Sequence, residues 1–299
     1  MAVHPEQQSI LSGDLRLAVR DYGRPAEAPG DAPFAPTLIA VHGYPDNQAM
    51  WEPVADLLRG DFHVVTYDVR GAGASEAPRS RQDYASERLV DDLVAVMDAV
   101  APGLPVHLLG HDWGSLQLWD AVTTESEDPR LRGRIASYTS ISGPSLDHMA
   151  HFVRTAPTAV RKQQARKSWY VNFFHVPVLP DLTWRLLHRP IGAQMARREG
   201  LPTSAWGSDL ARDGDNGLDL YRANILPRLR RPRAGRSNVP VQIVVPRRDP
   251  FISPQTVDAL DLDRFLSDWH RLDVDGGHWL PRTDPALVAQ LVRDWALRH

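Results

Sequence analysis

The sequence predicts an α/β fold with a mostly parallel central sheet, flanking helices and one helical insertion. Short apolar, β-branched runs alternate with helical patterns along the chain, which is typical of βαβ units. The 299 residues are 42% hydrophobic and 24% charged, which suits one large α/β domain with an insertion. The formal net charge is only −3, so we expect no nucleic-acid partner.

Seven runs of strand length are bounded by Gly, Pro or Asp, as buried parallel strands tend to be. After the first of them, a turn rich in Pro, Ala and Gly is expected over residues 23–36. The runs span residues 15–22, 37–41, 63–67, 106–109, 134–141, 239–245 and 269–274.

Three helices are predicted to flank these strands. Residues 86–100 form an amphipathic pattern, and Ser86 is placed to cap the start of this helix. A second helix is expected directly after Leu109, and a third over residues 284–297. The apolar residues that share one face of the first helix are Leu89, Val90, Leu93, Val94, Met97 and Val100.

Residues 144–238 break this alternation, because they are rich in Trp, Arg and Pro and lack strand runs. We expect them to form a helical cap, or lid, over a core made of residues 1–143 and 239–299. The cap has 16 Lys/Arg and 7 Asp/Glu, a net charge of +9, which leaves −12 for the core. This charge is either a solvated surface or a means of attracting anionic lipid or an acidic substrate. The Arg-rich run 228–236 carries most of the signal and also suits an exposed linker.

The chain has no cysteine, which excludes disulfides, thiolate metal sites and a cysteine nucleophile. No stretch approaches the roughly 18 apolar residues that span a bilayer, so no integral membrane segment is expected. Residues 1–20 lack the apolar segment of a secretory signal. We therefore expect a cytoplasmic protein.

The predicted strand 106–109 runs into Gly110-His111-Asp112-Trp113-Gly114, which matches the Gly-x-nucleophile-x-Gly turn between a strand and a helix. The usual nucleophile is Ser, and here it is Asp; a helix N-cap is the alternative role. An aspartate has an unperturbed pKa of about 3.9 and is ionised at neutral pH. It can displace a leaving group from saturated carbon and form an alkyl ester. The leaving group would be an epoxide oxygen or a halide.

His278 follows the last predicted strand in the run Asp-Gly-Gly-His-Trp and is the candidate base for ester hydrolysis. A neutral imidazole can take a proton from water near pH 7. Asp249 follows the preceding strand and is placed to orient His278 and stabilise its cation. The alternatives are a surface-loop histidine and local pairing of Asp249 with Arg247 or Arg248.

The run His-Gly-Tyr-Pro at 42–45 follows an early predicted strand. Its glycine lets the backbone turn close to the site, and the amides of Tyr44 and Trp113 are expected to bind the oxyanion during ester hydrolysis. One such donor is typically worth roughly 3 kcal/mol of barrier. A generic turn is the alternative, and the bond between Tyr44 and Pro45 is a candidate cis peptide.

Taken in order, His-Gly-Tyr-Pro, Gly-His-Asp-Trp-Gly, Arg-Arg-Asp-Pro and Gly-Gly-His-Trp resemble the motifs of epoxide hydrolases of the α/β-hydrolase fold. The resemblance extends from about residue 15 to 295 and includes a Gly-rich loop at 68–75. The chain most resembles the N-terminal hydrolase region of actinobacterial epoxide hydrolases that continue into a short-chain dehydrogenase. The resemblance implies a hydrolase that uses no metal or organic cofactor. The hydrolase either stands alone or forms part of a longer protein with a dehydrogenase domain, and the resemblance is compatible with a homodimer.

Two cap segments, 168–177 and 220–224, resemble family segments that each supply one tyrosine hydroxyl, here Tyr170 and Tyr221. In the family these hydroxyls hold and protonate the epoxide oxygen, whose alkoxide is otherwise a poor leaving group. Packing within the lid is the alternative for either tyrosine. Aromatic side chains are expected to bind the substrate (Trp113, Trp169, Phe173 and Phe174) or to shape the pocket (Trp184 and Trp206).

The predicted reaction converts an epoxide to a vicinal diol, and the aromatic, basic cap favours a large lipophilic substrate. Haloalkane dehalogenases share the Asp nucleophile and the following Trp, but they commonly have Asn where Tyr44 stands. Fluoroacetate dehalogenases have Arg after the nucleophile and a His-Trp pair in the lid, where this chain has Trp113 and two tyrosines. A non-catalytic receptor and an esterase using Ser115 are further alternatives.

Overall fold

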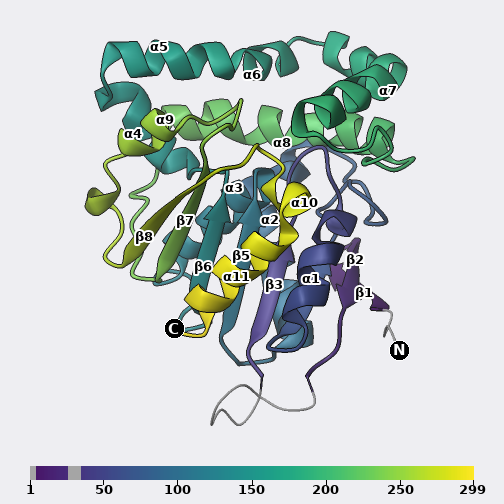
Figure 1. Cartoon of the computed structure of the whole chain (residues 1–299), viewed down its shortest axis with the longest axis vertical. Helices are drawn as coiled ribbons and strands as arrows, with labels where there is room; N and C mark the ends of the chain where they lie inside the picture. Colours follow the sequence, from purple (N-terminus) through teal and green to yellow (C-terminus); the bar gives the residue numbers. More distant parts are fainter. Residues whose placement is uncertain (1–4, 26–34) are drawn as a thin grey trace.

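The computed structural model describes residues 5–25 and 35–299, so most of the turn predicted over 23–36 lies outside the described residues. The sheet consists of β1 (Glu6–Ser12), β2 (Leu15–Asp21), β3 (Thr37–Val41), β4 (His63–Tyr67), β5 (Val106–His111), β6 (Ile135–Ile141), β7 (Val241–Pro246) and β8 (Trp269–Val274). Their order is β1-β2-β4-β3-β5-β6-β7-β8. The pairs β1–β2 and β2–β4 are antiparallel, and the other neighbours are parallel. The predicted α/β fold is therefore confirmed (Figure 1).

β1 is a strand that the apolar pattern did not predict. Its run Glu-Gln-Gln-Ser-Ile-Leu-Ser is mostly exposed, so it lacks the signature of a buried strand. It pairs with β2 over its whole length, from Glu6 opposite Asp21 to Ser12 opposite Leu15. The connecting turn includes Gly13 at a φ of 60°, a conformation that favours glycine. Backbone hydrogen bonds at the sheet edge, and not side-chain burial, define this strand.

Helices cover both faces of the sheet (Figure 1). α2 (Ser86–Val100) and α3 (Trp113–Thr124) pack on one face, and α1 (Glu52–Leu58) and α11 (Pro285–Ala296) pack on the other. The six apolar residues predicted to share a face of α2 are all buried. Shorter segments complete the core: η1 (Gln48–Trp51), η2 (Arg81–Tyr84), α9 (Pro254–Asp258), η3 (Leu262–Arg264) and α10 (Leu280–Thr283).

Two helix starts differ from the prediction. The helix expected directly after Leu109 begins at Trp113, because β5 continues to His111. Ser86 makes no side-chain capping bond, so its predicted capping role was wrong. Instead, the backbone N–H and the hydroxyl of Ser86 both donate to Oδ1 of Asn224, at 2.7 and 2.9 Å. Asn224, a residue of the insertion, therefore accepts the hydrogen bonds that the first residue of α2 donates.

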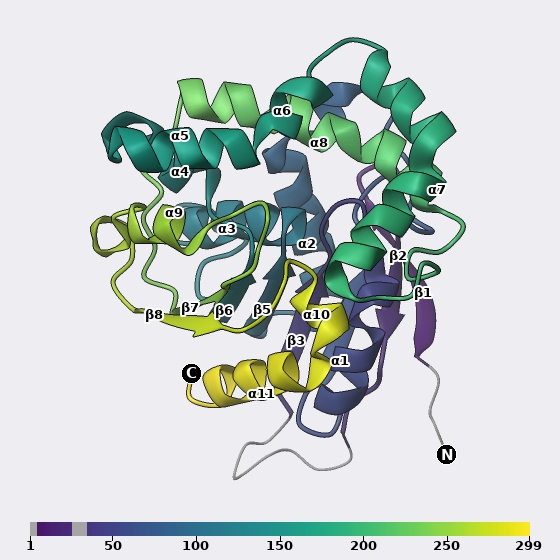
Figure 2. The ribbon, with the colours of Figure 1, turned by 45° about the horizontal axis from the view of Figure 1, so that its top comes forward.

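Residues 144–238 form the cap. Its helices lie above the carboxyl ends of the parallel strands (Figures 1 and 2). They leave the sheet after β6 and return to it at β7. None of the helices in the described part of the chain is long and apolar enough to cross a membrane. The cap helices are α4 (Leu146–Thr155), α5 (Thr158–Lys167), α6 (Trp169–Phe174), α7 (Leu179–Glu199) and α8 (Leu210–Arg230).

A buried ion-pair cluster joins the cap to the core. Arg228 of α8 donates to Asp120 of α3 at 2.6 and 3.1 Å and to Asp147 of α4 at 2.9 Å. These three side chains are 8%, 4% and 1% exposed, respectively. The run 228–236 is therefore not an exposed linker at its start, which corrects the prediction. α8 itself continues to Arg230.

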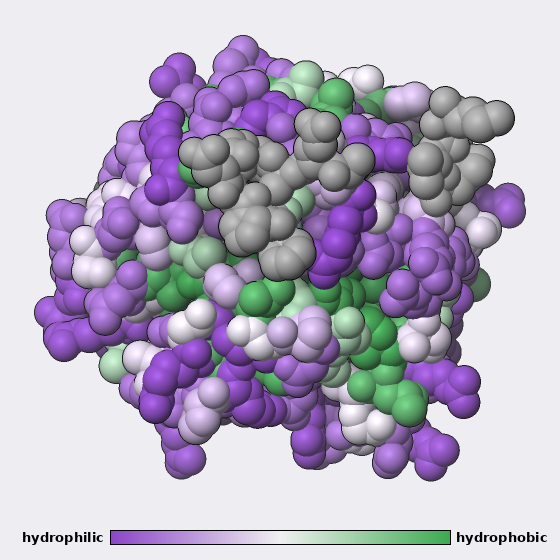
Figure 3. Space-filling view, turned by 90° about the horizontal axis from the view of Figure 1, so that it is seen from below, coloured by the Kyte–Doolittle hydropathy of each residue, from purple (hydrophilic) through white to green (hydrophobic). Residues whose placement is uncertain are grey.

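The end of the molecule opposite the cap is seen from below in Figure 3. Hydrophilic side chains dominate its margin, and hydrophobic ones gather in a band across the middle. The candidate catalytic residues lie at the other end of the molecule, because each follows the carboxyl end of a parallel strand. Asp112 follows β5, Asp249 follows β7 and His278 follows β8. The candidate site is therefore beneath the cap, where ligands bind in open α/β sheets.

Candidate active site

Asp112 lies in a tight turn between β5 and α3. Its φ is 51° and its ψ is −121°, a strained conformation for a residue other than glycine. Neighbouring glycines make room for the turn. A Cβ on Gly114 would come 2.1 Å from the carbonyl oxygen of Val41, and one on Gly43 would come 2.5 Å from Cβ of Asp112. The side chain of Asp112 makes no capping bond to α3 and instead lines a cavity under the cap.

Two backbone amides hold the carboxylate of Asp112. The N–H of Tyr44 donates to Oδ1 at 2.8 Å, and the N–H of Trp113 is a second donor. The peptide bond between Tyr44 and Pro45 is cis, as predicted. Burial raises the pKa of Asp112 to about 6, although the charge of His278 and both amides oppose the rise. The amides expected to bind an oxyanion therefore face the group on which an ester carbonyl would form.

His278 and Asp249 extend a chain of polar contacts behind Asp112. Nδ1 of His278 donates to Oδ2 of Asp249 at 2.9 Å, and its Nε2 lies 3.6 Å from Oδ2 of Asp112. Oδ1 of Asp249 accepts the N–H groups of Phe251 and Ile252 at 2.6 and 3.1 Å. These contacts hold the imidazole edge toward the Asp112 carboxylate, in the orientation that a base for water requires.

The charges of Asp112, Asp249 and His278 shift one another's pKa values. Burial alone would lower the pKa of His278, but the charges of Asp249 and Asp112 outweigh it and raise the pKa to about 9. Burial alone would raise the pKa of Asp249, but the charge and hydrogen bond of His278 lower it. Asp249 is thus paired with His278, whereas the neighbouring Arg248 pairs with Asp275. At neutral pH the imidazole is a cation between two carboxylates.

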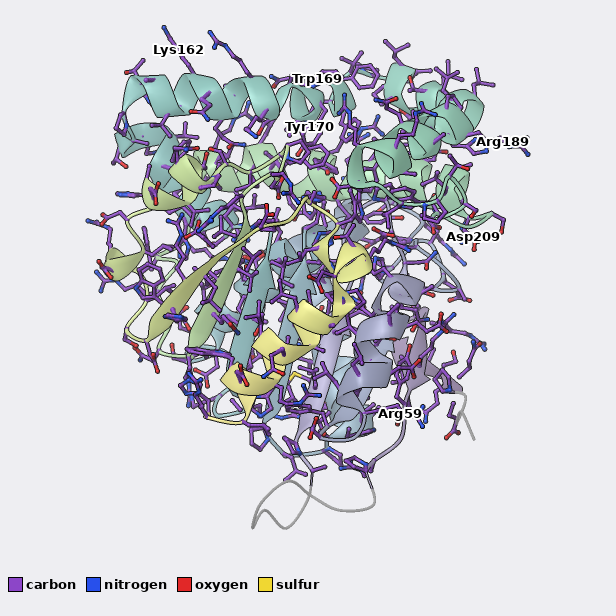
Figure 4. The ribbon with its side chains drawn as sticks, viewed as in Figure 1. Arg59, Lys162, Trp169, Tyr170, Arg189 and Asp209 are labelled. Carbon is purple, nitrogen blue, oxygen red and sulfur yellow. The ribbon has the colours of Figure 1, made fainter. Side chains whose placement is uncertain are left out.

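Tyr170 of α6 and Tyr221 of α8 approach Asp112 from the cap. Their ring centroids are 6.0 Å apart, and the ring of Tyr221 packs edge-on against Trp113 at 4.8 Å. Burial raises the pKa of both tyrosines, and the charge of Asp112 adds to the rise. Both hydroxyls therefore stay protonated at neutral pH and can donate. Figure 4 shows Tyr170 beneath α6, on the side of the sheet.

A cavity of about 390 Å³ brings the nucleophile candidate and the two tyrosines together. Asp112 and Trp113 line it from the core, and Tyr170 and Tyr221 line it from the cap. The cavity therefore offers a carboxylate and two phenols beside a largely apolar wall. That wall comes from α4, α8 and the loop after β7 and includes Leu146, Met149, Phe152, Val153, Ile225, Leu226, Leu229, Phe251 and Ile252.

The structure brings only one of the four expected substrate-binding aromatics to this cavity. Trp113 lines it, whereas Trp169, Phe173 and Phe174 lie outside its wall. Trp169 is 64% exposed and lies on the outer side of α6 (Figure 4). Successive helix residues point about 100° apart, so Trp169 turns outward when Tyr170 points to the sheet.

Phe174 and Trp184 pack behind the site instead. Both contact the ring of Tyr44 edge-on, at centroid distances of 5.8 and 5.7 Å. The hydroxyl of Tyr44 donates to the carbonyl of Gly214 at 2.8 Å, so it points into the cap and not toward Asp112. These contacts connect the cap to the core through the side chain of Tyr44, while its backbone amide faces Asp112.

Two residues that position His278 were not predicted. Nε2 of His111 donates to the backbone carbonyl of His278 at 2.8 Å, and burial lowers the pKa of His111 to about 3, which keeps its ring neutral. Glu199 of α7 accepts the N–H groups of His278 and Trp279, each at 3.3 Å. His111 lies within the turn motif of Asp112, a signal that could have found it. Glu199 is 79 residues from His278, and no local pattern marks it.

The sheet order, the turn at Asp112 and the histidine after the last strand define one class of protein. The family model described as alpha/beta hydrolase fold matches residues 36–285 of this chain. The chain therefore belongs to the α/β-hydrolase fold family.

Within that family, the chain resembles one protein named as a probable oxidoreductase and another named as an epoxide hydrolase. It is 33% identical over 298 residues to the probable oxidoreductase EphD of Mycobacterium tuberculosis, covering 94% of this chain and 48% of EphD. It is 28% identical over 179 residues to epoxide hydrolase A of the same organism, covering 59% of this chain and 50% of the relative. The chain thus spans about half the length of these curated relatives.

Solved structures with the same fold include two epoxide hydrolases. The Bacillus megaterium enzyme in complex with an inhibitor superposes with a TM-score of 0.75 at 20% identity, covering 98% of this chain and 100% of that one. A mutant of the Vigna radiata epoxide hydrolase superposes with a TM-score of 0.76 at 19% identity, covering 99% of each chain. At these identities the likeness shows the fold.

Proposed function

We propose that this chain hydrolyses an epoxide to a vicinal diol through an ester of Asp112. In the first step, Oδ2 of Asp112 attacks a ring carbon and the ring carbon–oxygen bond breaks. Tyr170 and Tyr221 donate to the ring oxygen, and one of them transfers its proton to it. The observation that carries the proposal is a carboxylate and two protonated phenols lining one largely apolar cavity.

In the second step, His278 takes a proton from water as the water oxygen adds to the ester carbonyl. The amides of Tyr44 and Trp113 bind the resulting oxyanion. When the intermediate collapses, the ester bond breaks and the leaving alkoxide takes the proton from His278, which releases the diol. The proton of the new carboxyl group passes to the tyrosinate, which restores the carboxylate of Asp112. In the first turnover the new oxygen of the diol comes from Asp112, and the water oxygen stays in the carboxylate.

The ester also prepares His278 for its role. In the free protein the charges of Asp249 and Asp112 raise the pKa of His278 to about 9, so the ring is protonated at neutral pH. Esterification removes the charge of Asp112, and the pKa of His278 is expected to fall. A larger share of the imidazole is therefore neutral at the stage that needs a base.

Dehalogenation by the same nucleophile is the alternative. It requires donors that hold a halide beside Asp112, and haloalkane dehalogenases commonly place an Asn at the position of Tyr44. Here the Tyr44 hydroxyl is bonded to the carbonyl of Gly214, at 2.8 Å, and is turned away from the cavity. Two phenols suit a leaving oxygen that must take up a proton, which favours an epoxide. A non-catalytic receptor would need neither the phenols nor the base.

The apolar walls contributed by α4 and α8 support a lipophilic epoxide as the substrate. The half-length match to EphD is compatible with a dehydrogenase region in a longer protein. That region, a homodimer and a cytoplasmic location remain expectations.

The test replaces the base and keeps the nucleophile. We expect His278→Gln mixed with styrene oxide to accumulate an ester, detected by intact-mass spectrometry and located at Asp112 by peptide mapping. His270→Gln, an exposed histidine on β8, is the matched control and should turn over without the adduct. Undiminished hydrolysis by His278→Gln with no adduct would overturn the proposal.

A further inference from the structure

The outer face of the cap carries an unusual share of exposed hydrophobic side chains. Of the thirteen large hydrophobic residues that are exposed in the described part of the chain, seven lie between residues 169 and 187. A monomer rarely leaves apolar groups clustered in this way unless they contact something. We call them the apolar ridge: Trp169, Val176, Val178, Leu179, Leu182, Leu186 and Leu187.

The local structure of the ridge turns these side chains to solvent. Leu179, Leu182 and Leu186 are spaced by three and four residues along α7, so they share one side of the helix. Leu186 is 73% exposed. Val178, in the turn between α6 and α7, is 64% exposed and has a φ of 66°, a rare conformation for a β-branched residue. The turn therefore presents an apolar side chain at the cost of backbone strain.

Cations without carboxylate partners flank the apolar ridge. Between Asp147 and Asp181 the sequence has five Lys/Arg and no acidic residue. Lys162 and Arg166 of α5 and Arg189 of α7 are exposed, and none of the three has an ion-pair partner among residues 5–25 and 35–299. Figure 4 shows Lys162, Trp169 and Arg189 at the outer surface of the cap, away from the sheet.

We propose that the apolar ridge and its flanking cations dock the cap onto a lipid bilayer that contains anionic lipids. An apolar face bordered by Lys and Arg is the pattern of elements that lie in the membrane interface. A second copy of the chain is the poorer fit, because a symmetric contact would place two caps of net charge +9 against each other. The bilayer supplies both the apolar medium and the opposite charge.

The cavity described above reaches the same part of the cap. Its wall includes Ala165 and Asn172 of α5 and α6, both exposed, and Leu226 of α8, which is 38% exposed. Docking would bring this opening close to the bilayer, from which a lipophilic compound could enter. The docking itself rests on the ridge and the cations and not on the proposed hydrolysis.

Vesicle sedimentation of the full chain tests the proposal. We expect roughly tenfold greater binding to phosphatidylcholine vesicles containing about 30% phosphatidylglycerol than to pure phosphatidylcholine, and loss of this difference at about 0.5 M salt. Leu182→Glu with Leu186→Glu should abolish binding, and Lys162→Glu with Arg166→Glu should remove the preference for the anionic lipid. Leu57→Glu with Leu104→Glu is the matched control, because both leucines are 46% exposed but belong to the core.

Thermal unfolding by circular dichroism establishes that each variant is folded, without reliance on activity. Equal binding by the ridge variant and by the control would overturn the proposal, as would no binding of the wild-type chain to anionic vesicles. Light scattering could also show that the wild-type chain is a dimer and that only the ridge variant is a monomer. That result would assign the apolar ridge to contact with a second copy and would overturn the proposal.

Discussion

In the proposed reaction, Asp112 has to be both ionised and reactive, and its surroundings set its pKa. An exposed aspartate has a pKa of about 3.9, and its carboxylate is a weak nucleophile. Burial raises the pKa of Asp112 to about 6, while the charge of His278 and the amides of Tyr44 and Trp113 limit the rise. The carboxylate is therefore more basic than a free aspartate and still largely ionised at pH 7.

The pH dependence of the two steps follows from these groups. Ester formation is expected to slow as the pH falls through about 6, because protonation removes the Asp112 nucleophile. Ester hydrolysis needs neutral His278, whose pKa in the ester is expected to lie below the value of about 9 in the free protein but is still raised by Asp249. This step should therefore speed up as the pH rises through the pKa of His278 in the ester. The ester should thus make up more of the enzyme at pH 6.5 than at pH 9. Rapid-quench mass spectrometry measures that share, and a share independent of pH would contradict the assigned base.

Removal of both cap hydroxyls, by Tyr170→Phe with Tyr221→Phe, is expected to lower kcat/KM for an epoxide by roughly 10²–10⁴-fold, because a positioned acid is lost. Steady-state kinetics on styrene oxide checks this. Tyr67→Phe is the matched control: this tyrosine is buried in β4, and its hydroxyl has no hydrogen-bond partner among the described residues. If the double variant and the control lose the same fraction of activity, Tyr170 and Tyr221 contribute packing alone and do not act as acids.

At the scale of elements, one face of α8 carries both a catalytic candidate and the contacts that hold the cap. Tyr221, Asn224 and Arg228 are separated by three and four residues, so they share one side of the helix. Tyr221 lines the cavity, Asn224 bonds to the start of α2 and to the carbonyl of Tyr84 at 2.8 Å, and Arg228 bonds to two buried aspartates. The anchorage of α8 therefore fixes where the Tyr221 hydroxyl lies.

Arg228→Met is expected to lower the free energy of unfolding by about 3–5 kcal/mol, because it removes the arginine that lies between the buried carboxylates of Asp120 and Asp147. Arg233 lies farther from Asp120, at 4.0 Å, and would replace only part of that charge. Urea denaturation measures the loss. Arg230→Met, two residues along the same helix but exposed, should change stability little. Adding Asp120→Asn and Asp147→Asn to Arg228→Met should recover part of the loss, and no recovery would show that the cluster is not the cause.

At the scale of the whole molecule, the sheet order assembles the site. β3, β5, β6, β7 and β8 are successive neighbours in the sheet. Their carboxyl ends therefore line up, and the loops that carry Tyr44, Asp112, Asp249 and His278 converge although they are remote in sequence. The cap adds Tyr170 and Tyr221 from the opposite side of the cavity.

The sequence was informative wherever a function resides in a short motif next to a strand. The turn at Asp112 and the loop of His278 were found because their glycines and their position after apolar runs are local features. β1 was missed because an exposed edge strand has no apolar pattern. Trp169 was expected at the substrate because its segment is aromatic, but the rotation of α6 directs Tyr170 inward and Trp169 outward.

The sequence by itself determined the fold class and the kind of chemistry on offer, because an aspartate in a nucleophile turn suits attack on saturated carbon. Only the tertiary structure decided which aromatic side chains reach the cavity, how His111 and Glu199 hold His278, and that His278 is charged beside Asp112. The physical reason is that burial, charge and hydrogen bonding depend on distances between segments that are far apart along the chain.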